Sequence, residues 1–116
     1  MNVFHYTDTS GWNAIRSQVV WRFLALQPHA KERPVGAYFT IIEPTPQNLR
    51  TLYKRIRVPK LKQEFVFWFT GDSGLQQLSS GRGRDRWILF SPIDYEVELG
   101  RQQAAESTDA VRGDVL

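Results

Sequence analysis

EFVFWFT, residues 64–70, is the stretch that decides the fold of this chain. Phenylalanine, valine and tryptophan follow one another from Phe65 to Phe69 with no polar residue between them. A short, aromatic and almost wholly apolar run is typical of a strand that is covered on both faces. The run therefore predicts a central strand, and the rest of the chain has to supply its neighbours and its cover.

The segment before this strand predicts a helix. Thr45 offers a capping hydroxyl, and Pro46 follows it at the first helical position. Apolar side chains then recur at helical spacing, at Leu49, Leu52, Tyr53 and Ile56. Pro59 bars further continuation, so the helix has to end before the strand begins.

The remaining apolar stretches predict further strands around this helix and strand. They cover residues 2–7, 19–24, 36–42, 86–90 and 94–99. A short helix over residues 12–16 follows the turn residues 8–11, whose side chains can cap it. The order of elements predicts an α+β fold with a split, mostly antiparallel sheet and two short helices.

Length and composition limit the chain to one compact domain. It has 116 residues, of which 41% are hydrophobic, enough for a packed core. Residues 1–100 are expected to form this domain. From Arg101 onward the sequence becomes polar, so residues 101–116 are expected to be a flexible tail outside the core.

Composition also excludes several classes of function. The absence of cysteine removes disulfides, thiol nucleophiles and cysteine-based zinc sites, and two histidines, His5 and His29, do not suffice for most metal centres. No apolar run approaches ~20 residues, and the N-terminus lacks the basic-then-apolar pattern of a signal peptide, so a cytoplasmic protein without membrane contact is expected. The net charge of +3 suits an anionic ligand or a nucleic acid.

Three polar residues lie in or beside the apolar strands: His5, Tyr38 and Asp94. Burial of an unpaired polar group costs roughly 1–3 kcal/mol, so each of them needs a partner. Taken singly, each is compatible with a structural role. A functional role requires that all three face one cleft.

The motifs around these residues resemble those of ADP-ribosyltransferases. HYT at 5–7, PVGAYFT at 34–40 and SPIDYEVE at 91–98 follow one another in the order of the small domains with a His-Tyr-Asp signature, found in bacterial toxins and in fungi. GAYFT is similar to the Gly-x-Tyr-Phe strand of poly-ADP-ribose polymerases. The resemblance covers residues 3–99. It implies an enzyme that cleaves NAD, releases nicotinamide without a metal, and transfers ADP-ribose to a protein, a nucleic acid or water.

The resemblance also implies a role for each matching residue. His5 would hydrogen-bond a ribose hydroxyl of NAD, and the backbone at Tyr6 would meet the nicotinamide carboxamide. Thr7 would add a hydroxyl contact. Tyr38 would stack on the nicotinamide ring, because an aromatic wall orients a flat leaving group. Asp94 would hold the 2′-hydroxyl of the nicotinamide ribose and stabilise the developing oxocarbenium ion.

The identity of the catalytic acid stays open at this point. Many relatives carry glutamate where this chain has Asp94. Period-two alternation places Asp94, Glu96 and Glu98 on one face of their strand, with Tyr95, Val97 and Leu99 on the other. A register shift of two residues would make Glu96 the acid.

Basic residues supply candidates for contact with the NAD pyrophosphate or with an acceptor. Arg16 and Arg22 lie near the first motif, and Arg82 and Arg84 lie in the glycine-rich loop 71–84. A further basic group follows the second helix: Lys54, Arg55, Arg57, Lys60 and Lys62. A solvated basic face is the alternative for both groups.

Two other functions remain compatible with the sequence. One is a basic module that binds nucleic acid or an ADP-ribose-like ligand without catalysis. The other is a NAD-dependent RNA 2′-phosphotransferase, which shares the fold of the resembling family. If the chain is the NAD-cleaving enzyme that the resemblance implies, it is expected to be a monomeric NAD glycohydrolase or ADP-ribosyltransferase. A toxin-like enzyme of this kind would act in the cytoplasm of a target cell.

Overall fold

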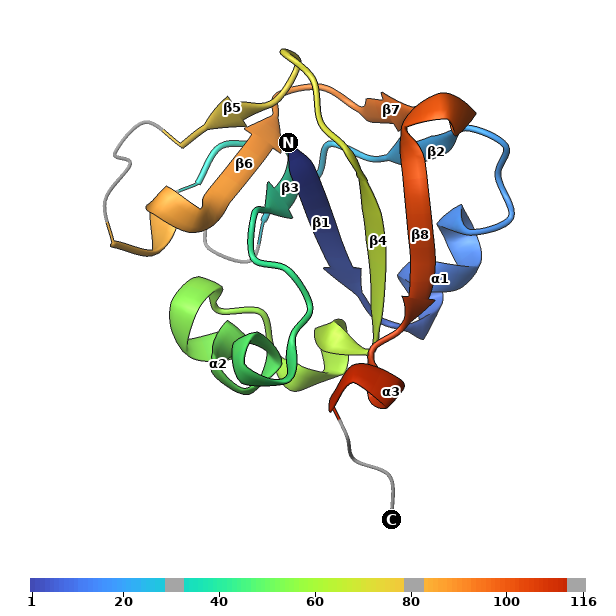
Figure 1. Ribbon diagram of the computed structural model, residues 1–116. Helices are drawn as coiled ribbons and strands as arrows, with labels where there is room; N and C mark the ends of the chain where they lie inside the picture. The colour runs from blue at the N-terminus through green and yellow to red at the C-terminus, as the bar shows by residue number, and fades with distance from the viewer. Residues whose placement is uncertain (29–32, 79–82, 113–116) are drawn as a thin grey trace.

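The computed structural model describes residues 1–28, 33–78 and 83–112 (Figure 1). The strands are β1 (Asn2–Thr7), β2 (Trp21–Phe23), β3 (Ala37–Thr40), β4 (Phe65–Thr70), β5 (Gln76–Gln77), β6 (Ile88–Ser91), β7 (Tyr95–Val97) and β8 (Gln102–Ser107). The helices are α1 (Thr9–Ile15), α2 (Pro46–Ile56) and α3 (Asp109–Arg112), with 3-10 turns η1 (Lys60–Gln63), η2 (Gly83–Trp87) and η3 (Leu99–Arg101).

The strands form two antiparallel sheets. Six of them pair in the order β5-β6-β3-β1-β4-β8, and β2 pairs with β7 in a separate small sheet. The predicted α+β class with a split antiparallel sheet is confirmed. The aromatic run forms β4, which lies between β1 and β8 in Figure 1, as expected for a strand inside the sheet.

Each face of the large sheet has its own apolar core. Alternate residues of a strand point to opposite faces, so Val3 and Phe4 of β1 belong to different clusters. One cluster packs the sheet against β2 and β7 through residues such as Phe23 and Val97. The other packs it against α2 through its buried side chains Leu49, Leu52 and Ile56. The helical spacing seen in the sequence thus faces the sheet, although Tyr53 is exposed.

The C-terminal segment differs from the prediction. Residues Gln102–Ser107 form β8 and pair with β4, and Thr108 is fully buried with its hydroxyl donating to the carbonyl of Gln63. The prediction of a tail outside the core from Arg101 onward is therefore wrong for these residues. An edge strand gains its backbone hydrogen bonds without needing an apolar sequence, which is why composition concealed it. Residues 113–116 lie outside the described part.

Smaller differences concern the ends of strands. Of the strand expected over 94–99, Tyr95–Val97 form β7, with Tyr95 and Val97 buried and Glu96 exposed. Leu99 was expected on the buried face, but it begins η3 and is 69% exposed. None of the helices in the described part of the chain has the length and apolar character needed to cross a membrane.

Candidate functional site

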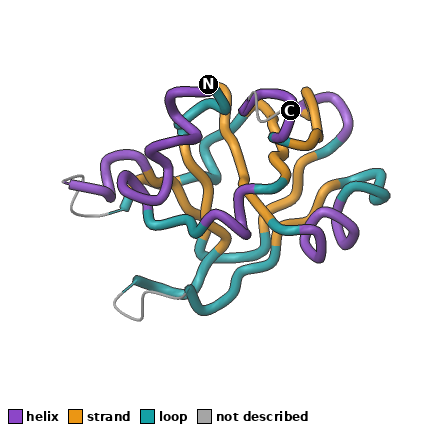
Figure 2. Tube along the Cα trace, turned by 90° about the horizontal axis from the view of Figure 1, so that it is seen from below, coloured by secondary structure: helices purple, strands orange, loops and turns teal. Residues whose placement is uncertain are grey.

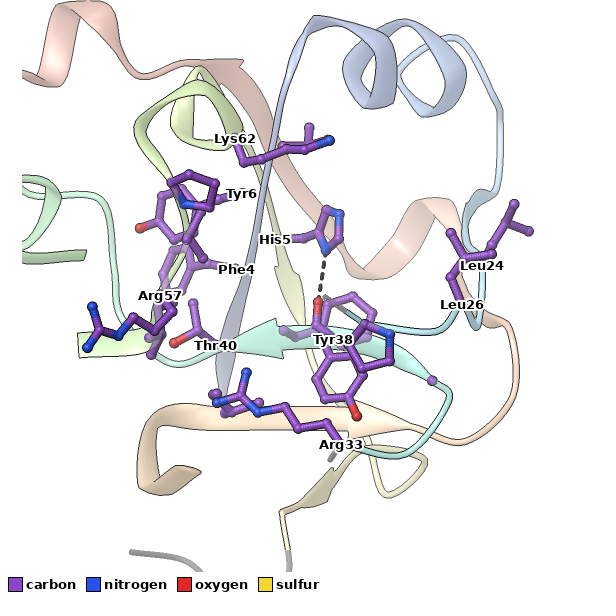
Figure 3. A pocket seen from close by; sticks show the side chains of 18 of the residues that line it. Phe4, His5, Tyr6, Leu24, Leu26, Arg33, Tyr38, Thr40, Arg57 and Lys62 are labelled. Carbon is purple, nitrogen blue, oxygen red and sulfur yellow. Dashed lines mark hydrogen bonds between the residues drawn. The ribbon is translucent and has the colours of Figure 1, made fainter. Parts of the chain in front are cut away.

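A pocket of about 520 Å³ lies where β1 and β3 diverge (Figure 3). β1 pairs with β4 along its whole length, whereas among the described residues it pairs with β3 only at Phe4 and Thr40. Beyond Phe4, the edge of β1 that faces β3 therefore has no strand partner in the described part of the chain. His5, Tyr6, Thr7 and Tyr38, which the resemblance assigned to NAD, all line this pocket.

His5 is held by β3 in a defined tautomer. Its Nδ1 lies 2.9 Å from the carbonyl oxygen of Tyr38. A carbonyl oxygen only accepts, so Nδ1 carries the proton and Nε2 of the neutral ring is an acceptor. Burial lowers the pKa of His5, an effect that outweighs its hydrogen bond to the carbonyl and keeps the ring neutral near pH 7.

The Nε2 atom of His5 is available to a ligand. No described residue forms a hydrogen bond with it. Nε2 also keeps some exposed surface, because Trp68 Nε1 is the one fully buried side-chain polar atom without a partner in the described part of the chain. The His5 ring is wedged between Phe23 and Phe39, with centroid distances of 4.8 and 5.5 Å. A fixed acceptor at this place suits a ligand hydroxyl.

Tyr38 forms a flat aromatic wall of the pocket. Its ring stacks on Phe90 with centroids 5.7 Å apart and an interplanar angle of 18°, and its hydroxyl donates to the carbonyl of Pro34. Burial raises the pKa of its hydroxyl. The ring is thus anchored along its face and at its tip. Tyr6 is anchored as well, since its hydroxyl donates to the Ile42 carbonyl at 2.8 Å.

Close packing of α1 places Thr7 at the pocket. A Cβ atom on Gly11 would lie 1.9 Å from Thr7 Oγ1, so only glycine allows the helix to approach this closely. Asp8 caps α1 by accepting from the Gly11 N–H, and its other oxygen accepts from Lys62 Nζ at 2.6 Å. Lys62 chiefly, and then the Gly11 N–H, lower the pKa of Asp8.

The charged part of the pocket lining is cationic. Arg33, Arg57 and Lys62 line it, and no described acid does. Lys62 is paired with Asp8, and Arg33 Nη2 lies 3.2 Å from Asp85. The guanidinium of Arg57 lies over the Tyr53 ring at 5.1 Å and has no carboxylate partner in the described part of the chain. Arg57 is therefore the cation that is free to pair with an anionic ligand.

The basic group that was predicted to follow the second helix begins within it, because Lys54 and Arg55 lie in the last turn of α2. The group contributes Arg57 and Lys62 to the pocket. Arg33 and the apolar wall formed by Leu24 and Leu26 were missed, because they follow β2 in connections with no distinctive pattern. The isolated bridge between Leu26 and Gly36 holds this wall beside β3.

Arg57 occupies a backbone conformation that is unfavourable for its side chain. It ends α2 with φ 60° and ψ 30°, and it is the one described non-glycine residue with positive φ. Glycine usually fills such a position after a helix. We expect Arg57→Gly to melt at or above the temperature of the wild type, because glycine adopts a positive φ without steric cost. Circular dichroism during heating measures the melting temperature, and a clear fall relative to the wild type would contradict this expectation.

The structure does not bring the two candidate acids into the pocket. Asp94 Oδ1 accepts from the Ala25 N–H at 2.7 Å, and its Oδ2 accepts from Arg22 Nη2 at 2.8 Å. The Ala25 N–H chiefly, and then Arg22, lower the pKa of Asp94. Glu96 pairs in register with Arg22 and is exposed. Asp94 nevertheless lies close to the site, because Ala25 separates the two wall residues Leu24 and Leu26.

Of the other predicted arginines, Arg16 and Arg22 do not line the pocket. Arg16 lies over the Trp12 ring at 5.5 Å, and Arg22 is occupied by Asp94. Arg82 lies outside the described residues, and the side chain of Arg84 does as well.

Comparisons with other proteins supply no relative. No protein-family model matches the chain, and no curated protein or solved structure matches it. The function is therefore argued from the site itself.

Proposed function

We propose that the chain is a NAD-cleaving enzyme that releases nicotinamide and transfers ADP-ribose to a macromolecule or to water. The observation that carries the proposal is the convergence of His5, Tyr6, Thr7 and Tyr38 on one pocket. They come from two strands more than thirty residues apart, and an independent resemblance selects all four. A volume of about 520 Å³ lies within the usual range of roughly 300–1,000 Å³ for ligand sites.

The nicotinamide half of NAD and its pyrophosphate would each meet a complementary group of this pocket. The nicotinamide ring would lie against Tyr38, and its carboxamide would meet the unpaired backbone edge at Tyr6. His5 Nε2 would accept a hydrogen bond from a ribose hydroxyl. Arg57 would pair with the pyrophosphate, since it is the lining cation without a carboxylate partner.

The reaction breaks the bond between the ribose C1′ and the nicotinamide nitrogen. The electron pair leaves with nicotinamide, which departs neutral, and positive charge spreads over C1′ and the ring oxygen of the ribose. Water or an acceptor then bonds to C1′ and loses a proton. A carboxylate near C1′ would stabilise the cation. Asp94 does not line the pocket, but it accepts from the Ala25 N–H between the wall residues Leu24 and Leu26, and it is the acid we assign to this role.

A second candidate is a module that binds NAD or ADP-ribose without cleaving it. The observation that favours it is the double engagement of Asp94 by Arg22 and Ala25, away from the pocket lining. Under this alternative Asp94 holds the pocket wall and does no chemistry.

The deciding experiment incubates the full chain with NAD labelled on its adenylate half. Free nicotinamide with label on a macromolecule indicates transfer, and free nicotinamide with labelled ADP-ribose indicates hydrolysis. A NAD-dependent rise in melting temperature without nicotinamide release supports the second candidate. If NAD neither is cleaved nor raises the melting temperature, both proposals are wrong.

Tyr38 variants test the stacking role in the pocket. Tyr38→Phe keeps the ring and loses the hydrogen bond to Pro34, so nicotinamide release should fall only a few-fold. Tyr38→Ala removes the wall, and release should fall at least about ten-fold because the leaving group is no longer oriented. Nicotinamide is measured by chromatography, and circular dichroism confirms folding. Equal inactivity of two folded variants would refute stacking.

A further inference from the structure

Positive charge is concentrated in one segment of the chain. Residues 44–63, which contain α2 and η1, include no acid and six cations: Arg50, Lys54, Arg55, Arg57, Lys60 and Lys62. The other nine of the fifteen Lys and Arg are outnumbered by twelve Asp and Glu, so the remainder of the chain is net acidic. Such a charge asymmetry is the electrostatic footprint of an anionic partner.

Few of these cations are neutralised within the chain. Lys62 pairs with Asp8, and Arg55 lies over the Trp87 ring at 4.2 Å and donates to Asn48. The others are exposed and have no carboxylate partner among the described residues: Arg50, Lys54, Arg57 and Lys60. No described carboxylate offsets the repulsion between these cations, so binding of an anionic ligand would reduce it.

A second cavity opens beside this charge. It has a volume of about 380 Å³ and lies between α2, η1 and α3. Its lining includes Arg50, Tyr53, Lys60 and Arg112, and none of the described residues that line it is an acid. Arg112 is fixed there, because its Nη2 donates to both the carbonyl and the side-chain oxygen of Gln63, at 3.1 and 3.0 Å.

One cation–π contact joins a residue of the first cavity to a residue of the second. Tyr53 lines the second cavity, and the guanidinium over its ring belongs to Arg57, which lines the first. We call the exposed residues along this route the basic face: Arg50, Tyr53, Lys54, Arg57 and Lys60. It combines spaced cations with an aromatic ring that is 53% exposed.

We propose that the basic face binds single-stranded nucleic acid. The cations pair with successive phosphates, and a base stacks on Tyr53, the combination by which proteins hold single strands. The hollow between α2 and α3 admits a flexible strand, whereas a duplex groove requires a protruding element. The apolar stripe of α2 is buried against the sheet, so it cannot serve insertion into a membrane. Binding does not depend on NAD cleavage, so the two proposals fail separately.

Fluorescence anisotropy of the full chain with a labelled twelve-nucleotide single-stranded RNA, in the absence of NAD, tests the proposal. Affinity should fall with salt with a logarithmic slope of roughly −2 to −3, the value for about three or four phosphates on a single strand. Arg50→Ala with Lys60→Ala should weaken binding at least ten-fold and flatten that slope. Tyr53→Ala should weaken binding about ten-fold with the slope unchanged.

The controls separate this partner from others. Arg16→Ala removes a cation from an exposed position next to Trp12, away from α2 and η1, and should change affinity less than three-fold. The same sequence as a duplex, a polyglutamate peptide and phosphatidylserine vesicles should bind at least ten-fold more weakly. The proposal is overturned if the single strand does not bind, if any of these ligands binds as tightly, or if the control variant loses as much affinity.

Discussion

Removal of residues 102–116 should leave a chain with no cooperative unfolding transition. The deletion takes away β8, which pairs with β4 from Phe65 to Phe69, and it removes the buried Thr108. It also removes Gln102, whose amide donates to the carbonyls of Val19 and Val97 and so joins the two sheets. Domains are stable by only about 5–15 kcal/mol, so the loss of a whole strand exceeds the margin.

Circular dichroism during heating measures this outcome. Glu106→Ala serves as the control, because Glu106 is exposed on β8 and its replacement should change the free energy of unfolding by less than about 0.5 kcal/mol. A truncated chain that melts cooperatively within a few degrees of the wild type would contradict the role of β8.

The fold could be predicted where the pattern of apolar side chains indicates which residues are buried. The run from Phe65 to Phe69 marked an interior strand, and the spacing of Leu49, Leu52 and Ile56 marked the helix that covers the sheet. β8 was not predictable from composition, because an edge strand is held by backbone hydrogen bonds and its polar side chains remain solvated. Only the complete sheet shows that β4 needs a neighbour there.

The pocket was predictable only in part, for a related reason. His5 and Tyr38 are unusual residues in apolar strands, and β1 and β3 are neighbours, so they meet. Leu24 and Arg33 lie in connections whose course depends on tertiary contacts such as the bridge between Leu26 and Gly36. Nothing in their sequence distinguishes them. The pairing of Arg22 with Asp94 depends on the small sheet, which joins segments about seventy residues apart.

Asp94 has been assigned two roles: stabilising the developing cation, and holding the Leu24–Leu26 wall by accepting from the Ala25 N–H. Substitutions at this position can separate the two roles. Asparagine keeps an oxygen that accepts from the Ala25 N–H, so Asp94→Asn preserves the Leu24–Leu26 wall and removes the charge. If the charge acts on the developing cation, kcat for nicotinamide release should fall by about 10²-fold or more with KM nearly unchanged. Asp94→Ala removes the wall contact as well and should also raise KM.

Two further variants complete the test of Asp94. Arg22→Ala frees one carboxylate oxygen without removing the charge, so it should lower kcat by less than ten-fold. Glu96→Gln changes an exposed side chain and should leave both constants within two-fold of the wild type. Normal kcat in Asp94→Asn together with a raised KM in Asp94→Ala would make Asp94 a positioning residue and favour the binding module. Loss of nicotinamide release in Glu96→Gln alone would transfer the catalytic role to Glu96.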